Sequence, residues 1–494
     1  MTYTVLRILT YVLGIVGSAL VLPLATAFIE GEKEMIPVFL APMALAWAAS
    51  LTFMIRARGK IGVLGIQDAF GVVAVLWIVI CLFGAVPLYF SGAFNSLTDA
   101  VFESVSGFTT TGASVLSDIE KLPRSVNLWR CQTHWLGGMG VVALAVAMIP
   151  LLGAGGFRLL KAESTGPDKG KFTASITTTA KILWFVYVGL TALQATLLWR
   201  CGLDPVDSVA HAFSTLGTGG FSTRNASVGA FGIPAAEWIC TLFMLLASVS
   251  FVLYCRLFTR RFPEVLRNTE LKVFLTIVPV AVFLVWIFEA LAHGGGNISL
   301  RAAAFQVASI LSTTGFMTSD YTKWLSSSQF ILLAMCFIGG CSGSTAGGVK
   351  IVRWVILAKQ FGNEIKRLLH PYGVFTMRLN GTSGREMFVP AVAGFMFAYF
   401  ALVAITALFG TIAGLGPFTA FTAALSMVGN VGPAFGNLGP TSNYGDIPTL
   451  LKWWYMFAML AGRLEIYTLL ILFGSFPWER RVRKTAPFSK VNES

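Results

Sequence analysis

Long apolar stretches without charged residues recur along the chain, separated by shorter polar segments. Ten of them approach or exceed roughly 18 residues, the length that an α-helix needs to cross the hydrocarbon core of a bilayer. These stretches are 8–28, 36–55, 69–90, 131–157, 182–199, 238–255, 273–288, 324–349, the first part of 387–445, and 453–478. The pattern predicts an all-α polytopic membrane protein with ten transmembrane helices.

Four segments between these stretches are too short and too polar to cross a bilayer, and each contains a cluster of Ser, Thr and Gly. They are residues 95–115, 205–222, 299–318 and 417–434. Non-helical backbone at membrane depth is tolerated only where protein or a water-filled cavity satisfies its polar groups. We therefore predict four re-entrant segments, each made of a short helix and a glycine-containing loop.

The composition agrees with a membrane protein, because 55% of the 494 residues are hydrophobic and only 12% are charged, about half the charged fraction of a soluble domain. With the N-terminus inside, the inside loops hold 26 of the 36 Lys and Arg, the outside loops hold nine, and Arg463 falls within a span. The positive-inside rule then places both termini in the cytoplasm and opens the four re-entrant segments outward. The net charge of +13 therefore reflects topology, with the lipid bilayer and no nucleic acid as the expected partner.

The four re-entrant segments align without gaps when one glycine from each is placed in register. The glycines are Gly112, Gly220, Gly315 and Gly432, at intervals of 108, 95 and 117 residues. A serine stands six residues before each glycine. These serines are Ser106, Ser214, Ser309 and Ser426. The recurrence predicts four pseudo-symmetric copies of a helix, re-entrant segment and helix around one axis, preceded by two extra helices.

Such loops are typical of a pore whose backbone carbonyls replace the water shell of an ion. Glycine adopts positive φ without strain and lets four strands approach one axis. Because the C-terminal ends of the short helices carry partial negative charge, a cation is favoured there. The candidate filter residues are Thr110, Thr111, Gly112, Thr218, Gly219, Gly220, Thr313, Thr314, Gly315, Asn430, Val431 and Gly432. The alternative is small-residue helix packing, which does not predict a serine at one offset in four copies.

The predicted span 324–349 is interrupted at 339–348, where five of ten residues are glycine. Because each glycine in a helix interior costs about 1 kcal/mol relative to alanine, we expect a loop or kink at mid-membrane. One hypothesis is a gate on the cytoplasmic side of the filter. The alternative is a helix-packing seam through Gly339, Gly343 and Gly347. The candidate gate residues are Gly339, Gly340, Gly343, Ser344, Thr345, Gly347, Gly348 and Arg463.

Arg463 stands in the middle of the last predicted span, where a charged residue is a functional candidate by default. Glu465 is two residues away and so not at the i,i+4 spacing of a local ion pair. A guanidinium that faces a cation pore would form an electrostatic barrier or part of a gate. The alternative is a structural ion pair with another helix.

Other polar residues lie inside the repeats. Asp99 and Asp207 stand thirteen residues before their glycines, where we predict that each caps its short helix. Glu103, His211 and Gln306 stand nine residues before theirs. They either tune ion access or are hydrogen-bonded polar residues behind the filter.

The sequence contains no HExxH, GxSxG or GxxxxGK[ST] motif, and therefore no indication of an enzyme. Its seven cysteines have no CxxC pair and are predicted to be packing residues. We expect a transport protein that needs no cofactor. A secondary transporter that couples the ion to H⁺ or Na⁺ remains the rival hypothesis, because such proteins also use broken helices at the midplane.

The chain resembles the bacterial Trk/Ktr/HKT superfamily of potassium transporters, and within it the TrkH/TrkG/TrkI branch. The resemblance covers nearly the whole chain, including the two helices before the first repeat. It rests on the motifs TTTGA at 109–113, GGFST at 219–223, FIGGC at 337–341 with GST at 343–345, and GRLE at 462–465.

The resemblance implies uptake of K⁺ through one pore per subunit in the bacterial inner membrane, and a homodimer. It also implies a TrkA-like cytosolic ring that binds nucleotides and docks on the basic inner face. By the same analogy, residues 339–348 form an intramembrane gate and Arg463 faces the pore. One departure is that Ser250 and Tyr254 stand where relatives have Asn and His, which bears on the polar contacts of the gate.

The predicted repeats divide the chain into six parts. These are the N-terminal helix pair 1–66, pore repeats 67–160, 161–262, 263–370 and 371–478, and a basic cytoplasmic tail 479–494. The second helix of the third repeat is the broken one.

Overall fold

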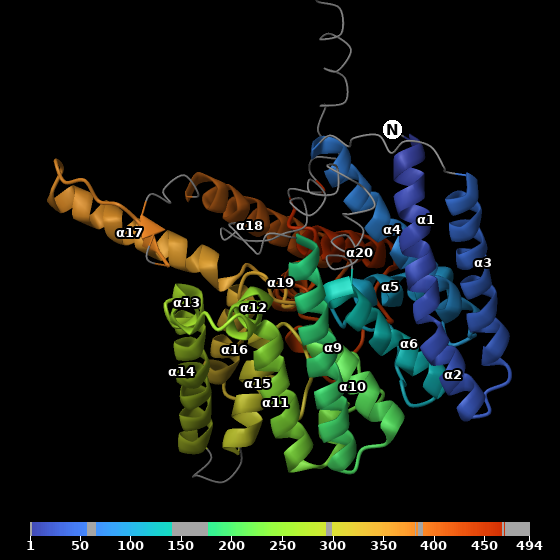
Figure 1. Ribbon diagram of the computed structural model, residues 1–494. Coiled ribbons are helices and arrows are strands. Elements are labelled where there is room, and N and C mark those ends of the chain that lie inside the picture. The colour runs from blue at the N-terminus through green and yellow to red at the C-terminus, as the bar shows by residue number, and fades with distance from the viewer. Residues whose placement is uncertain are drawn as a thin grey trace, which may run out of the picture.

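The computed structural model describes residues 2–56, 66–140, 176–292, 299–380, 382–383, 389–466 and 469. It is built almost wholly from helices (Figure 1). Within the described part, six helical stretches are long and apolar enough to cross a membrane. They are formed by α1 (Thr2–Ala19) with α2 (Val21–Ile29), α3 (Met35–Arg56), α4 (Ile66–Phe90), α9 (Ile176–Arg200), α14 (Thr269–Ala292) and α18 (Val389–Ile412). The helical class is confirmed.

The other four predicted spans are shorter or broken. The first is α6 (Arg124–Trp135), which continues as the π-helix η1 (Leu136–Gly140); the rest of 131–157 lies outside the described residues. The last is α20 (Thr449–Arg463), and most of the stretch beyond it also lies outside them. The count of ten spans therefore stays a prediction.

The predicted span 238–255 is not one continuous helix, because it consists of α11 (Pro234–Ser248) and α12 (Phe251–Phe258), bent by 88°. Val249 is extended, with ψ 144°. The amide of Phe251 donates to the carbonyl of Gly343 at 2.9 Å instead of to its own helix. The break therefore depends on a contact with a segment about ninety residues away in the sequence.

Each re-entrant segment begins with a helix of 12 or 13 residues: α5 (Leu97–Phe108), α10 (Pro205–Gly217), α15 (Leu300–Leu311) and α19 (Pro417–Gly429). At about 1.5 Å per residue these short helices reach roughly 20 Å, too little to span a bilayer.

The N-caps of the short helices differ from those predicted. They lie sixteen residues before the loop glycines, at Ser96, Asp204, Ser299 and Gly416. Ser96, Asp204 and Ser299 accept a backbone N–H through their side chains. The predicted caps Asp99 and Asp207 lie in the first helical turn. There a carboxylate still interacts favourably with the helix dipole.

The short helices form a closed cycle with their neighbours. Each packs against the helix that precedes it, in the pairs α4 with α5, α9 with α10, α14 with α15, and α18 with α19. Each also packs against the second helix of the preceding predicted repeat, in the pairs α6 with α10, α11 with α15, α16 (Ser326–Ile338) with α19, and α20 with α5. The last pair joins the last short helix's neighbour to the first short helix, so the cycle closes.

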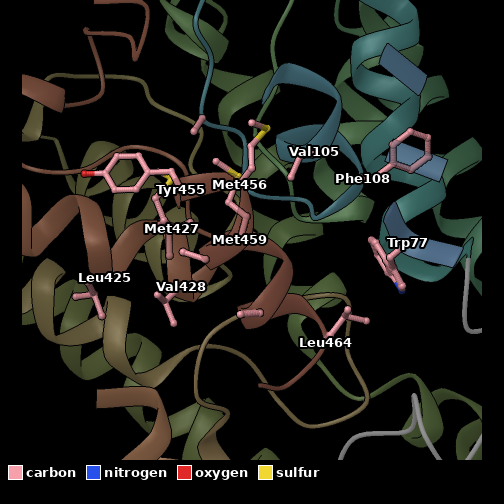
Figure 2. Close-up of a cluster of buried hydrophobic side chains, with 14 of the residues drawn as sticks. Trp77, Val105, Phe108, Leu425, Met427, Val428, Tyr455, Met456, Met459 and Leu464 are labelled. Atoms are coloured by element: carbon pink, nitrogen blue, oxygen red, sulfur yellow. The ribbon is translucent and has the colours of Figure 1, made fainter. Parts of the chain in front are cut away.

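The core lies between these helices. Met456 and Met459 of α20 lie among apolar side chains of α5 and α19, including Val105 and Val428 (Figure 2). The first turns of α17 (Ile351–Leu369) belong to this core through Ile351, Val352, Val355 and Ile356, and the rest of the helix extends away from the body of the molecule (Figure 1).

The remaining described elements are short. They are α13 (Phe262–Leu266), η3 (Ser227–Phe231), η4 (Tyr321–Lys323), η6 (Gly436–Leu438), and an antiparallel pair of strands, β1 (Arg378–Leu379) and β2 (Thr382–Ser383).

Candidate ion pathway

The four loops after the short helices share one backbone conformation. The residue two positions before each loop glycine is left-handed: φ is 54° at Thr110 and Thr218, 56° at Thr313 and 54° at Asn430. The loop glycines themselves have φ of 79°, 84°, 78° and 98°. Only glycine adopts such angles without steric cost. The four aligned glycines therefore stand at positions where the backbone conformation itself requires glycine.

Hydrogen bonds at the helix ends repeat as well. The amides of Thr111, Gly219, Thr314 and Val431 donate to the carbonyls of the four aligned serines, at 2.8, 2.9, 2.9 and 2.9 Å. A bond of this span around a left-handed residue is the Schellman pattern of helix termination. The serine hydroxyls do not share one role, since among the described residues only Ser309 donates, to Phe316.

The loops approach each other so closely that no side chain fits at the glycines. A Cβ added to Gly112 would lie 1.9 Å from the carbonyl oxygen of Gly219, and one on Gly220 would lie 2.0 Å from that of Thr314. A Cβ on Gly315 would lie 2.2 Å from the oxygen of Val431. One on Gly432 would lie 2.4 Å from the oxygen of Thr111. The contacts run from each loop to the next and return to the first, so the four loops form a closed ring.

The residues nine positions before the glycines tie the chain beyond each loop back to the short helix. Glu103 accepts the amide of Val115 at 3.0 Å, and His211 Nε2 lies 2.9 Å from the hydroxyl of Ser222. Gln306 donates to the carbonyl of Ser319 at 3.3 Å. Of the two interpretations given above for Glu103, His211 and Gln306, all three residues fit the second, in which they are hydrogen-bonded polar residues behind the loops.

A buried ion pair supports the first loop, and it was missed from the sequence. Arg130 Nη2 lies 2.6 Å from Glu103 Oε1, and both side chains are fully buried. The Arg130 guanidinium also lies 4.3 Å from the ring centroid of Phe221, a cation–π geometry. Arg130 is one of the nine basic residues that the predicted topology counts in outside loops. Its partner Glu103 lies 27 residues earlier, on α5, so no local sequence pattern indicates that the two residues pair.

His134 lies directly behind the second loop. Its ring stacks on Phe221 with centroids 4.2 Å apart, and Nδ1 accepts the amide of Phe221 at 3.4 Å. A Cβ on Gly219 would meet this nitrogen at 2.0 Å. Gly219 is therefore a glycine because the imidazole fills the space behind it.

The Gly-rich loop, residues 339–348, lies between α16, which ends at Ile338, and α17, which begins at Ile351. The predicted break is confirmed, and the alternative of a packing seam on a continuous helix is wrong. The backbone amide of Cys341 donates to the carbonyl of Ser248 at 2.9 Å. The hydroxyl of Thr345 donates to the carbonyl of Ala247 at 3.1 Å. These two hydrogen bonds attach the Gly-rich loop to the end of α11, at the break between α11 and α12.

Glu270 binds both the Gly-rich loop and the first turn of α17. One carboxylate oxygen accepts the amide of Ser342 at 2.6 Å and that of Val352 at 3.1 Å. Near Ser342 and Glu270, Ser250 and Asn380 also line a small cavity.

Arg463 links the Gly-rich loop to the first repeat. Its guanidinium donates to the carbonyl of Thr345 at 3.0 Å and to those of Gly137 and Gly138 at 2.6 and 3.1 Å. Glu465 instead pairs with Arg353 at 2.8 Å. The contacts made by Arg463 thus join α20, the Gly-rich loop and the π-helix η1, three segments far apart in the sequence.

Tyr254 and Ser250 lie beside the break between α11 and α12. The Tyr254 hydroxyl donates to the carbonyl of Leu246 at 2.8 Å, which lies just before the end of α11. Ser250 lies at the N-terminus of α12, and its Oγ would be 3.2 Å from a Cβ on Gly343. Both residues therefore contact the segments that shape the Gly-rich loop.

Within the described ranges, no three His, Cys, Asp or Glu side chains gather as a metal site. The oxygens that converge at the ring are backbone carbonyls, and carbonyl rings coordinate ions without acidic side chains. The seven cysteines are free thiols, six of them buried, in agreement with a packing role.

A family model described as a cation transport protein, TrkH, matches residues 37–483. The chain is 38% identical over 487 residues to the Trk system potassium uptake protein TrkH of Halomonas elongata, covering 96% of this chain and 99% of that protein. The chain belongs to the TrkH family.

Other members of the family agree over similar lengths. Identity to the Trk system potassium uptake protein TrkG of Escherichia coli is 32% over 490 residues, 96% of this chain and 98% of TrkG. The crystal structure of the potassium transporter TrkH from Vibrio parahaemolyticus superposes with a TM-score of 0.85 at 33% identity, covering 97% of this chain and 100% of that one. The fold is therefore that of a multi-pass TrkH-family membrane protein.

Proposed function

We propose that this protein takes up K⁺ across the bacterial inner membrane through a channel-like pore. The observation that carries the proposal is the closed ring of four loops, in which each glycine touches the carbonyl of the next loop. Rings of backbone carbonyls coordinate dehydrated K⁺. The named activity of its relatives, potassium uptake, agrees with this chemistry.

The proposed filter consists of the twelve candidate residues in the four loops. The four short helices end at these loops, so the partial negative charge of their C-termini favours a cation. The glycines set the spacing of the carbonyls, whereas the Thr, Asn and Val neighbours keep the lumen narrow.

The proposed gate is the Gly-rich loop together with Arg463. The loop lies against the filter residues Thr313 and Asn430, and Arg463 holds it to Gly137 and Gly138 across the molecule. A fixed positive charge at this position also opposes the passage of a cation.

We further propose the arrangement around the pore. Two subunits form a homodimer, both termini lie in the cytoplasm, and a TrkA-like nucleotide-binding ring docks on the basic inner face. The repeat boundaries 67–160, 161–262, 263–370 and 371–478 belong to the same proposal.

The deciding experiment measures K⁺ and Na⁺ flux in the purified, reconstituted protein at a clamped membrane potential. A channel moves K⁺ down its own electrochemical gradient whether or not pH and Na⁺ gradients are imposed. K⁺ driven uphill by either gradient would contradict the channel and establish symport. Glu103 and Glu465 already pair with Arg130 and Arg353, which weighs against their serving as a second ion site.

A further inference from the structure

The Gly-rich loop is hydrogen-bonded to the four-loop ring at two adjacent amides. Gly347 N–H donates to the side-chain hydroxyl of Thr313 at 2.6 Å, and Gly348 N–H donates to the carbonyl of Gly429 at 2.9 Å. Thr313 belongs to the third loop, and Gly429 is the last residue of the fourth short helix. Two donors of the loop thus reach oxygens of two neighbouring repeats.

The equivalent side chains of the other repeats make different contacts. Among the described residues the Thr110 hydroxyl has no hydrogen-bond partner, and that of Thr218 donates to the neighbouring carbonyl of Gly217 at 2.6 Å. Asn430 donates to the hydroxyl of Thr111 and to the carbonyl of Met459, both at 3.0 Å. At this register, only Thr313 accepts an amide of the Gly-rich loop in the described part of the chain.

The Gly-rich loop approaches the third and fourth repeats so closely that no side chain fits between them. A Cβ on Gly347 would lie 2.4 Å from the carbonyl oxygen of Gly429 and 3.3 Å from the Thr313 hydroxyl. The two ends of the loop also touch, because a Cβ on Gly339 would lie 2.8 Å from the carbonyl of Gly347. The glycines therefore seat the loop directly against the ring.

We propose that Thr313 couples the gate to the filter, because its hydroxyl serves either the Gly347 amide or the permeating cation. This inference rests on the proposed pore function. An N–H dipole that points at an oxygen repels a cation that approaches the same oxygen. The hydrogen bond from Gly347 and the binding of a cation at the Thr313 hydroxyl therefore oppose each other. Cation binding at Thr313 thus releases the Gly-rich loop, and release of the loop strengthens cation binding, since coupling between two sites is reciprocal.

Thr313→Val tests the coupling, with Thr422→Val as the control. Both changes replace by a methyl a buried hydroxyl that accepts a backbone amide, from Gly347 at Thr313 and from Phe435 at Thr422, but Thr422 lies outside the proposed filter and gate. We expect Thr313→Val to raise the resting K⁺ leak of reconstituted protein roughly two- to tenfold, the usual effect of one hydrogen bond, relative to Thr422→Val. Equal leaks in the two variants would overturn the coupling.

Hydrogen exchange of the wild-type chain provides a test that needs no variant. Amide exchange of a peptide covering 339–348 is followed by mass spectrometry in KCl and in choline chloride of equal ionic strength. Faster exchange in KCl is expected, because the cation displaces Gly347 from the Thr313 hydroxyl. In Thr313→Val the difference between the salts should disappear. Exchange that does not respond to K⁺ in the wild type would also overturn the coupling.

These outcomes separate the coupling from the pore itself. A wild-type protein that carries no K⁺ current contradicts the proposed function. A wild-type K⁺ current with equal leaks in Thr313→Val and Thr422→Val contradicts the coupling alone.

Discussion

Threonine is an unusual residue at a left-handed position, because its β-branched side chain crowds the backbone there. Thr110, Thr218 and Thr313 nevertheless adopt φ of 54–56°. Such conformations cost of the order of 1–3 kcal/mol each and persist where the surroundings over-determine them. Here the Schellman bonds and the contacts between neighbouring loops supply that constraint.

Gly315→Ser should reduce K⁺ flux. The new Cβ would lie 2.2 Å from the carbonyl oxygen of Val431 at a φ of 78°, so the ring must deform. We expect at least a roughly tenfold loss in reconstituted flux, corresponding to about 1.4 kcal/mol in the barrier. Gly414→Ser is the control, since Gly414 has φ 93° but open space around it. Unchanged flux in normally expressed Gly315→Ser would refute the filter assignment.

Glu103→Gln should destabilise the protein, because the buried Arg130 would lose its counter-charge. Breaking a buried ion pair from one side costs about 3–5 kcal/mol, so the melting temperature in detergent should fall clearly. The exposed pair of Glu364 with Arg367 offers the control Glu364→Gln, for which we expect almost no change. Equal melting temperatures for wild type and Glu103→Gln would contradict this account.

Helix ends and breaks decide how the elements meet. α16 stops at a run of glycines, and the chain resumes as α17 after the Gly-rich loop. α11 stops at Ser248 in an apolar sequence without glycine, because Gly343 accepts the amide of Phe251. The first break has a local cause in the sequence and the second has a tertiary one.

Arg463→Ala should open the pathway. The change removes the donor that holds Thr345 to Gly137 and Gly138, together with a positive charge. Hydrogen bonds from a charged donor contribute roughly 1.5–3 kcal/mol each, so we expect resting K⁺ flux to rise about tenfold or more. The control is Arg367→Ala on the exposed face of α17. Wild-type flux with a lowered melting temperature would instead identify a purely structural role.

Closure of the whole molecule depends on contacts between its first and last repeats. Lys452 Nζ lies 2.6 Å from Asp99 Oδ1, across 353 residues of sequence, and also donates to the carbonyl of Gly445 at 2.7 Å. The amide of Tyr444 donates to the carbonyl of Ser114 at 2.8 Å. The predicted topology counts Lys452 among the nine basic residues of the outside loops, yet its side chain is only 8% exposed.

Lys452→Met should weaken this closure. It leaves the carboxylate of Asp99 largely buried without its cation, which we expect to cost about 3 kcal/mol and to lower the melting temperature. Lys121→Met, which breaks the more exposed pair with Asp118, should have little effect. If both variants melt alike, the ring does not depend on this ion pair.

The sequence by itself determined the apolar helices, the register of the four glycines and the break at 339–348. Each follows from a local property: the length of an apolar run, the need for positive φ, or the cost of glycine in a helix. The caps Ser96 and Asp204 are local as well, since each accepts an amide two or three residues ahead, although the predicted caps stand one turn later. Only the tertiary structure decided that α11 ends early, where Phe251 donates to Gly343, and that Arg130 pairs with Glu103. These two contacts join residues well separated in the sequence, and their energies exist only once the helices have packed together.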